Sequence, residues 1–326
     1  MNVLITSAGR RTSLLEAFKC AVEKRNGQVF AGDLDHLAPA LYFAHGAFKL
    51  PPVASPEYGE SLKQIVAEKD IKVIIPTIDN ELPVMARMKD EFLKMGCRVV
   101  VSSYELIDIA QDKWKTVRFF KERGISVPQS WLPESGGSST LDRQMSLPEV
   151  VFIKPRNGSA SQFTFRIKKE EVSSFAKVVP FPIVQEHLPY TEITVDALLD
   201  LNGNLVHYVP RKRIRTVGDE SIQGVTLPDN DVRDWLIRLL NIISELGGIG
   251  PITVQYFSSP DGPILSEINP RFGGGFPLTL AAGGDYPEWI LQMVEGIRVE
   301  PRIGEYRTGL YMSRYYCELI FDQPVW

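Results

Sequence analysis

Two stretches near the end of the chain place oxygen-bearing side chains at alternating positions. Residues 251–257 and 264–269 each alternate apolar and polar types, and a turn-forming run separates them, so we predict a β-hairpin. Gln255, Glu267 and Asn269 then lie on the polar side of the hairpin. Their carboxylate and amide oxygens are ligands that Mg²⁺ accepts when it is shared with nucleotide phosphates. The alternative is an ordinary hairpin whose polar residues are solvated.

The register and the flanks of this hairpin favour the metal hypothesis. A register that pairs Ser258 with Ile264 also pairs Gln255 with Glu267, and Leu265 then shares the face of Glu267. The opposite face is expected to be apolar and to hold Ile252, Val254, Ile264 and Ile268. Arg271 comes two residues after Asn269 and can bind a phosphoryl oxygen bidentately. Three glycines follow at 273–275, where the backbone must come close to another group, and we expect that group to be a substrate.

Length and composition indicate an ordinary globular protein of two or three domains. The chain has 326 residues, of which 44% are hydrophobic and 23% charged, and its net charge is −4. This balance does not favour nucleic-acid binding. No apolar run approaches the ~20 residues of a membrane span, and the start of the chain lacks the features of a signal peptide. The isolated thiols Cys20, Cys97 and Cys317 fit a reducing compartment, so we expect a cytoplasmic location.

The positioning elements begin with a domain at 1–106. Short apolar strands alternate with helices there, which predicts a doubly wound parallel sheet. A nicotinamide cofactor is disfavoured because the first strand–helix turn, residues 6–11, has one glycine where the dinucleotide fingerprint needs three. Arg10 and Arg11 at a helix N-terminus could hold an anion. Thr77, Asp79 and Glu81 follow a strand at the edge where such sheets bind ligands, with solvated turn residues as the alternative.

The middle of the chain carries features suited to a nucleotide. Lys154 ends a predicted strand, and the small-residue loop 156–162 can fold over phosphates through backbone N–H groups, although a plain hairpin loop would look the same. A connector between the strands at 183–188 and 192–199 can present backbone groups to an adenine edge. Glu192, just beyond the connector, can accept two ribose hydroxyls. For the basic run 211–215 we favour polyphosphate binding over nucleic-acid binding or a solvated edge strand.

With these features in this order, the chain resembles the ATP-grasp superfamily, in particular the unit found in the large chain of carbamoyl-phosphate synthase. The segments FIKP, VQEHLPYTEITVDALL and VQYF…LSEINPRFGGG carry the resemblance. It implies an α/β protein with a pre-ATP-grasp domain at 1–106 and a two-lobed ATP-grasp domain at 107–326. The lid subdomain would span about 115–184 and the C-terminal metal-binding lobe about 185–326.

The resemblance also implies roles for individual residues. The nucleotide-binding residues would be Lys113, Lys154, Gly158, Ser159, Ser161, Glu186, His187, Leu188 and Glu192, with 186–188 as the adenine hinge and Glu192 as the ribose acid. Gln255, Glu267 and Asn269 would bind two Mg²⁺ ions, with Mn²⁺ as an alternative metal. Arg271, helped by Arg213 and Arg215, would stabilise the transferring phosphoryl group.

The implied activity is an ATP-dependent, C–N bond-forming ligase that joins a small carboxylate to an amine through an acylphosphate. Alternatives on the same fold are a kinase-like phosphotransferase and an ATP-binding subunit that needs a partner chain. The lid loop has one glycine where relatives usually carry several, and the chain is too short for a complete carbamoyl-phosphate synthase. We expect small-molecule substrates, no nucleic acid and no membrane, and consider a homodimer. The acid and the amine cannot be named from these residues.

Overall fold

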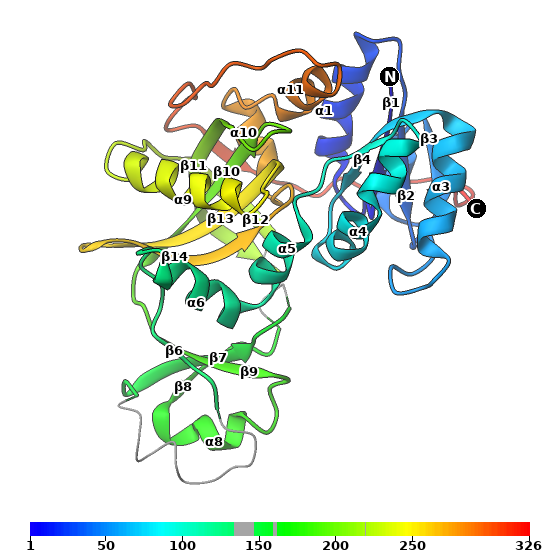
Figure 1. Cartoon of the computed structure of the whole chain (residues 1–326). Coiled ribbons are helices and arrows are strands. Elements are labelled where there is room, and N and C mark those ends of the chain that lie inside the picture. The colour runs from blue at the N-terminus through cyan, green and yellow to red at the C-terminus, as the bar shows by residue number, and fades with distance from the viewer. Residues whose placement is uncertain (134–146, 159–161, 219) are drawn as a thin grey trace.

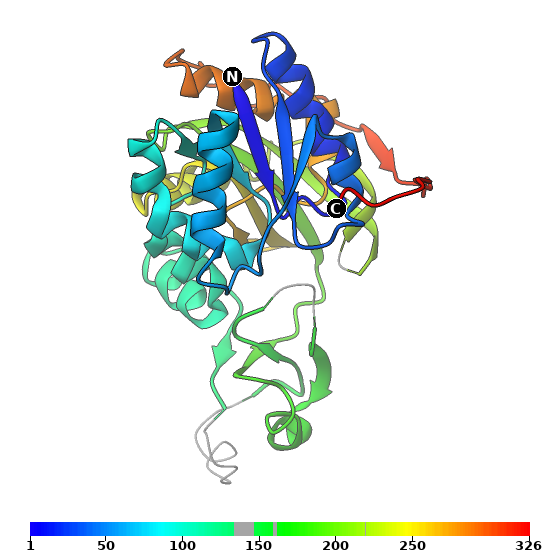
Figure 2. The same ribbon diagram turned by 90° about the vertical axis from the view of Figure 1, so that its right-hand side faces the viewer.

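The computed structural model describes residues 1–133, 147–158, 162–218 and 220–326. In these ranges no helix is long and apolar enough to cross a membrane. The described chain forms three sheets, of five, four and six strands. Figures 1 and 2 show the four-stranded sheet standing apart from the other two, which lie against each other.

The five-stranded sheet is parallel, in the order β3-β2-β1-β4-β5. Its strands are β1 (Asn2–Thr6), β2 (Val29–Asp33), β3 (Gly46–Lys49), β4 (Ile71–Pro76) and β5 (Arg98–Val99); its helices are α1 (Thr12–Glu23), α2 (Pro39–Phe43), α3 (Tyr58–Lys69) and α4 (Leu82–Lys94), with the short 3₁₀ turn η1 (Asp79–Glu81). Val3 and Ile5 of β1 pack in the cluster that contains α1, while Leu4 packs in the cluster of α3 and α4. The predicted doubly wound parallel sheet is therefore confirmed.

Two consecutive helices lead to the small sheet. These are α5 (Tyr104–Gln111) and α6 (Lys113–Glu122), and the side chain of Asp112 caps α6 by accepting from the backbone N–H groups of Trp114 and Lys115. The small sheet is antiparallel and follows the order β6-β9-β7-β8. Its elements are β6 (Ser130–Trp131), β7 (Val150–Pro155), β8 (Phe165–Lys168), η2 (Lys169–Glu171), α8 (Val172–Phe175) and β9 (Pro182–Glu186).

The six-stranded sheet is antiparallel and has the order β14-β13-β10-β11-β12-β15. Its strands are β10 (Thr191–Leu199), β11 (Leu205–Val217), β12 (Glu220–Thr226), β13 (Gly250–Ser259), β14 (Gly262–Asn269) and β15 (Tyr311–Ser313). One face packs on α9 (Arg233–Glu245): Val195 and Val254 meet Leu239 and Leu240 in one buried cluster. The last strand, β15, is short and pairs with β12 through residues 311–313.

The other face meets α10 (Phe276–Ala281), α11 (Tyr286–Val294) and the N-terminal domain. Phe272 and Phe276 share a buried cluster with Phe18 of α1, and the rings of Phe18 and Phe272 meet edge to face with centroids 6.0 Å apart. The segment after β15 returns to the N-terminal domain, where Phe321 stacks on Tyr42 with centroids 4.1 Å apart. The end of the β14 segment is thus fixed against the N-terminal sheet.

The β13–β14 hairpin is confirmed, with one change of register. Gln255 faces Glu267 as predicted, but Tyr256 already faces Leu265, so Ser266 is an extra, bulged residue. Ile264 is consequently opposite Phe257, and the predicted pairing of Ser258 with Ile264 is wrong. The bulge also moves Leu265 onto the apolar face, where it is 1% exposed and joins the core in place of Ile264. A single inserted residue exchanges the two faces because strand side chains alternate.

Candidate nucleotide and metal site

The face of the six-stranded sheet opposite α9 carries a row of polar residues. The registers align Glu267 with Gln255, Gln255 with Thr194, and Thr194 with Arg211 across four adjacent strands. Residues directly opposite one another project to the same face. One row therefore contains two of the candidate metal ligands, a hydroxyl and an arginine.

The candidate metal ligands lie at the β14 edge of this row. Glu267 is partly buried, and its carboxylate accepts no hydrogen bond from the residues that the structure describes. Burial raises the pKa of Glu267, against the lowering influence of the Lys113 and Lys154 charges. Asn269 is the last residue of β14, and its Oδ1 lies 3.5 Å from Nη2 of Arg271. A partly buried carboxylate without a hydrogen-bond donor beside two amide side chains fits a divalent cation.

Two lysines bring positive charge to the same place. Lys154 lies on the face of β7 opposite its core, since Val151 and Ile153 form the core of the small sheet. Burial and, to a smaller extent, the nearby Lys113 charge lower the pKa of Lys154 to about 8, although the Glu267 and Glu192 carboxylates oppose this shift. These mutual influences place both lysines within electrostatic range of the candidate metal ligands.

The loop after β7 is tied to the start of α6. The Lys113 ammonium donates to the carbonyl of Gly158 over 3.0 Å, and the Lys113 backbone N–H donates to Arg156. The Arg156 guanidinium forms an ion pair with Asp112, the capping residue of α6. The glycine has φ +132°, which L side chains rarely adopt. Ser159 and Ser161 lie outside the described residues.

The predicted hinge connects the two antiparallel sheets. Glu186 ends β9 and its carboxylate accepts from the backbone N–H of Gln129 over 2.8 Å. The His187 ring lies 5.5 Å from the ring of Phe152, which shares the face of Lys154 on β7. Leu188 follows in the connection to β10. The three residues thus lie where the small sheet joins the large one.

The next row of the large sheet holds an ion pair between two candidate site residues. Glu192 of β10 pairs with Arg213 of β11, and Ser266 donates to the other oxygen of Glu192 over 3.4 Å. Arg215 is exposed further along β11. The candidate ribose acid is therefore engaged by an arginine that the sequence analysis assigned to phosphoryl transfer.

Arg271 is held by the N-terminal domain. Its Nε and Nη2 donate to the two oxygens of Asp79 over 2.7 and 2.6 Å, and its Nη1 donates to the Phe272 carbonyl. Arg11 makes a second link: it donates to the carbonyls of Thr77 and Phe272 over 2.9 and 3.2 Å. Asp79, which could not be assigned from the sequence, thus contacts the candidate catalytic arginine.

Glu81 and Thr77 have structural roles, so neither the ligand nor the solvated-turn interpretation holds for them. Both are fully buried. The Glu81 carboxylate accepts from the backbone of Thr77 and Ile78 and from the hydroxyls of Ser7 and Tyr58. Burial raises the pKa of Glu81, which those hydrogen bonds oppose. These residues shape the turn that presents Asp79.

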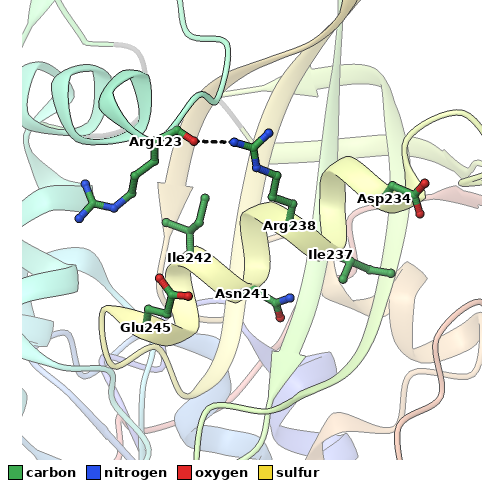
Figure 3. A pocket seen from close by; sticks show the side chains of 7 residues that line it. All are labelled: Arg123, Asp234, Ile237, Arg238, Asn241, Ile242 and Glu245. Atoms are coloured by element: carbon green, nitrogen blue, oxygen red, sulfur yellow. Dashed lines mark hydrogen bonds between the residues drawn. The ribbon is translucent and has the colours of Figure 1, made fainter.

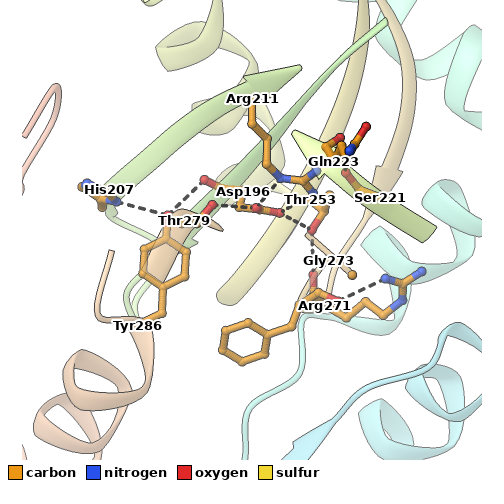
Figure 4. Close-up of polar contacts among 12 residues, drawn as sticks. Asp196, His207, Arg211, Ser221, Gln223, Thr253, Arg271, Gly273, Thr279 and Tyr286 are labelled. Carbon is orange, nitrogen blue, oxygen red and sulfur yellow. Dashed lines mark hydrogen bonds and ion pairs between the residues drawn. The ribbon is translucent and has the colours of Figure 1, made fainter. Parts of the chain in front are cut away.

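Gly273, shown in Figure 4, and Gly275 lie against a buried polar network of the protein itself, so the expectation that these glycines lie against a substrate was wrong. A Cβ on Gly273 would meet Asp196 Oδ1 at 2.7 Å, and a Cβ on Gly275 would meet the Arg211 guanidinium at 2.3 Å. Asp196 accepts from Arg211 Nε over 2.8 Å and from the Thr279 hydroxyl over 2.7 Å. Thr253 donates to the Arg271 carbonyl over 3.1 Å.

The sequence analysis missed Asp196 and its partners. Asp196 lies in an otherwise apolar strand, 195–199, and a charged residue at such a position was the available signal. Arg314, at the end of β15, also contacts the network by donating to the Gly274 carbonyl.

A separate shallow groove of about 500 Å³ lies on the outer surface of α9 (Figure 3). Its lining includes Asp234, Asn241 and Glu245, and Arg238 donates to the carbonyl of Arg123 across it over 2.7 Å. Because α9 covers the apolar face of the sheet, this groove is on the side away from the polar row.

Two family models match the chain. Residues 3–100 match the model described as "PylC-like, N-terminal domain", and residues 179–315 match "ATP-grasp in the biosynthetic pathway with Ter operon". Among curated relatives, the carbamoyl phosphate synthase large chain of Saccharolobus solfataricus is 26% identical over 60% of this chain, which spans 20% of that relative. The formate-dependent phosphoribosylglycinamide formyltransferase of Flavobacterium psychrophilum is 23% identical over 90% of this chain and 76% of its own length.

Solved structures share the fold. The biotin carboxylase domain of the Hydrogenobacter thermophilus 2-oxoglutarate carboxylase, solved with MgADP, ADP and bicarbonate, has a TM-score of 0.74 at 14% identity and covers 95% of this chain and 73% of its own. The N5-carboxyaminoimidazole synthetase of Staphylococcus aureus has a TM-score of 0.72 at 16% identity, covering 94% and 79%.

By these matches residues 179–315 belong to the ATP-grasp superfamily and residues 3–100 to the PylC-like N-terminal domains, and the described chain has the α/β ATP-grasp fold. The ATP-grasp relatives are ATP-dependent enzymes, and that family uses ATP and Mg²⁺.

Proposed function

We propose that the protein is an ATP-dependent carboxylate–amine ligase. The observation that supports this most strongly is the meeting of three charged groups from separate elements: Lys154 of β7, Lys113 of α6 and Glu267 of β14 each influence the protonation of a neighbour. A site with two cations and an acidic metal ligand suits a nucleotide polyphosphate and its metal.

The proposed roles are those that the resemblance implies for the candidate residues. Lys113, Lys154 and the loop residues Gly158, Ser159 and Ser161 bind phosphates; Glu186, His187 and Leu188 bind adenine; Glu192 binds ribose; Arg271, Arg213 and Arg215 stabilise the transferring phosphoryl group. Gln255, Glu267 and Asn269 hold two Mg²⁺ ions, with Mn²⁺ as an alternative metal. The metal would neutralise phosphate charge. We propose the domain limits 1–106 and 107–326, a boundary that falls within α5.

The reaction joins two substrates at the cost of one ATP. A carboxylate oxygen of the acid attacks the γ-phosphorus, the bond to the β–γ bridging oxygen breaks, and ADP and an acylphosphate form. The amine nitrogen then attacks the acyl carbon, phosphate leaves with its bonding electron pair, and the nitrogen loses a proton. The protein contributes charge and position: Lys154 and Arg271 face the transferred group, and the Glu192 carboxylate can orient the nucleotide.

Glu192 has to exchange partners for this role. In the structure Arg213 occupies its carboxylate, so ribose hydroxyls compete with that guanidinium. An arginine released from Glu192 lies on the same strand as Arg211 and Arg215 and becomes available for phosphate. This exchange is consistent with both proposed roles.

The relatives support an acid as one substrate. One solved neighbour holds bicarbonate together with MgADP, one curated relative is named for its use of formate, and another solved neighbour is an L-amino acid ligase of Bacillus licheniformis, with a TM-score of 0.69. Because this chain spans only 20% of the first carbamoyl phosphate synthase relative, that enzyme's complete activity is not part of the proposal.

The proposal is tested by a screen of small carboxylates crossed with amines. Purified protein with ATP and Mg²⁺ is assayed for ADP and free phosphate, and Glu267→Gln protein serves as the blank. We expect release of both products to require one acid and one amine together. Release of ADP without phosphate would indicate a kinase-like phosphotransferase, and no carboxylate-dependent ADP release with any pair would contradict the proposal.

A further inference from the structure

The polar row of the large sheet contains a hydroxyl that the protein leaves unused. Thr194 is 1% exposed, and its Oγ1 has no hydrogen-bond partner in the part of the chain that the structure describes. It lies on β10 directly between Gln255 of β13 and Arg211 of β11. A buried hydroxyl without a partner costs free energy. The unpaired Thr194 hydroxyl, at this place in the row, indicates that a ligand supplies the missing hydrogen bond.

Arg211, the next residue of the row, is preorganised. The arginine and Asp196 are each 3% exposed. Nε and Nη2 donate to the carboxylate over 2.8 and 3.3 Å, and in the described residues all hydrogen bonds of this guanidinium go to Asp196. Nη1 is among the atoms that a Cβ on Gly275 would meet, at 2.3 Å. Because Cζ lies equally close to that Cβ and Nη2 lies 2.7 Å from it, the bare backbone of Gly275 packs over the face of the guanidinium and not against its Nη1 edge.

Asp196 itself is fully engaged by protein groups. Besides Arg211 it accepts from the Thr279 hydroxyl over 2.7 Å, and the Thr253 hydroxyl, which shares its proton with the Arg271 carbonyl, lies 3.3 Å away. It fixes the orientation of the guanidinium and offsets its charge. An arginine held on one edge in this way can still offer N–H donors to an anion on the other.

The spacing relative to the candidate metal ligands suits an acceptor of the phosphoryl group. Adjacent strands lie about 4.8 Å apart, so Thr194 is about 5 Å and Arg211 about 10 Å along the row from Gln255. A nucleotide phosphate held at Gln255 and Glu267 would face the Thr194 position, and a carboxylate there would lie between the phosphate and Arg211.

We propose that Thr194 and Arg211 form the subsite for the carboxylate that receives the phosphoryl group, with Asp196 as the residue that positions Arg211. The ligand class is a small carboxylate anion: one oxygen accepts from the Thr194 hydroxyl and another from the Arg211 Nη1 edge. The inference rests on the proposed function, because it assumes that an acid is activated at this metal site.

The sharpest test is Thr194→Val, a replacement of similar shape that removes only the hydroxyl. Loss of an unpaired buried hydroxyl should not lower the melting temperature. Thr191→Val, at the exposed start of the same strand, is the matched control. Arg211→Lys is the second variant: it retains a cation for Asp196 and removes the Nη1 edge.

Each protein is saturated with Mg–ADP and then titrated with bicarbonate, acetate and the standard L-amino acids, with thermal shift and calorimetry as readouts. At least one carboxylate should bind wild type and Thr191→Val equally. Its Kd should rise by about tenfold to a hundredfold in Thr194→Val and Arg211→Lys, as for loss of a hydrogen bond to a charged group, while Mg–ADP stabilises all four proteins.

Three results separate the two proposals. A carboxylate that binds wild type and Thr194→Val within twofold would overturn the subsite. The subsite would also be overturned if Mg–ADP stabilises the wild-type protein but none of these carboxylates binds to it. Failure of Mg–ADP to stabilise the wild-type protein would instead contradict the proposed function.

Discussion

The two halves of the polar face differ in how their residues are arranged along the chain. The metal half, at β13 and β14, is local: Glu267, Asn269 and Arg271 are alternate residues of one segment. The arginine half, at β10 and β11, is assembled from distant residues, and Asp196 alone contacts Arg211, Thr253 and Thr279. A site built from one segment can be read as a motif, whereas a site built by strand pairing cannot.

The halves also differ in how their charges are satisfied. The Glu267 carboxylate accepts no hydrogen bond from the described residues, so its oxygens are available to bind a cation. In the arginine half the Asp196 carboxylate is saturated by protein groups. We therefore expect changes in the metal half to alter turnover at little cost in stability, and changes to Asp196, Arg211 and the residues packed on them to alter both.

The largest effect is expected for Glu267→Gln. The neutral amide keeps the shape but cannot bind a cation as a carboxylate does, so ADP release should fall by about 10²–10³, as for other preorganised charged or polar groups in catalysis. The melting temperature should stay within a few degrees of wild type. ATP turnover at the wild-type rate would remove Glu267 from the metal site.

Asp79→Asn should reduce turnover by about tenfold to a hundredfold, because the bidentate hold on Arg271 is lost and a positioning error of this kind costs up to about 10². Affinity for ADP should change less than twofold, since among the described residues the Asp79 carboxylate accepts hydrogen bonds only from Arg271. Asp108→Asn, which removes the exposed partner of Lys115, is the matched control. Equal turnover in both variants would show that the N-terminal domain does not position Arg271.

Gly275→Ala tests whether the arginine half determines stability. The added methyl would lie 2.3 Å from the Arg211 guanidinium, and relieving such overpacking typically costs about 1–3 kcal/mol of unfolding free energy. The residue has φ −87°, so the backbone itself tolerates alanine. Denaturant unfolding measures the loss. Because the clash is with one side chain, combining Gly275→Ala with Arg211→Lys should cost less than the sum of the single changes.

The smallest effect is a pH dependence through Lys154. Burial lowers its pKa to about 8, so the side chain is a cation below that pH and loses its charge as the pH rises through it. Phosphates bind the cation, and ADP affinity should therefore fall severalfold between about pH 7 and about pH 9. In Lys154→Arg the decline should be absent, because arginine stays protonated. Calorimetry across this range gives both curves, and parallel curves would contradict the assignment.

The same pKa has a consequence for stability with the opposite sign. Between about pH 8 and the ordinary lysine value of 10.5, the unfolded chain holds the proton more often than the folded chain does. The unfolding free energy contributed by Lys154 therefore rises with pH in this window and is at its lowest below it. Nucleotide affinity and intrinsic stability respond to this one group in opposite directions.

Much of the fold could be predicted because its signals are local. The parallel sheet followed from short apolar strands separated by helices, and the hairpin from alternation around a turn. The edge strand at 46–49 was not predicted, since its four residues are partly exposed or exposed and show no buried run. The bulge at Ser266 was missed because nothing in the alternation of 264–269 marks which residue is extra.

By itself the sequence determined the order of the candidate site residues and the pairing of Gln255 with Glu267, because both depend on periodicities within a few residues. Tertiary structure alone decided that Asp79 holds Arg271, that the glycines at 273–275 pack on Asp196 and Arg211, and that Thr194 is left without a partner. The Arg211–Asp196 pair and the Arg271–Asp79 pair join residues 15 and 192 positions apart. Such distant side chains meet only after strands have paired and domains have packed, and no local pattern records that.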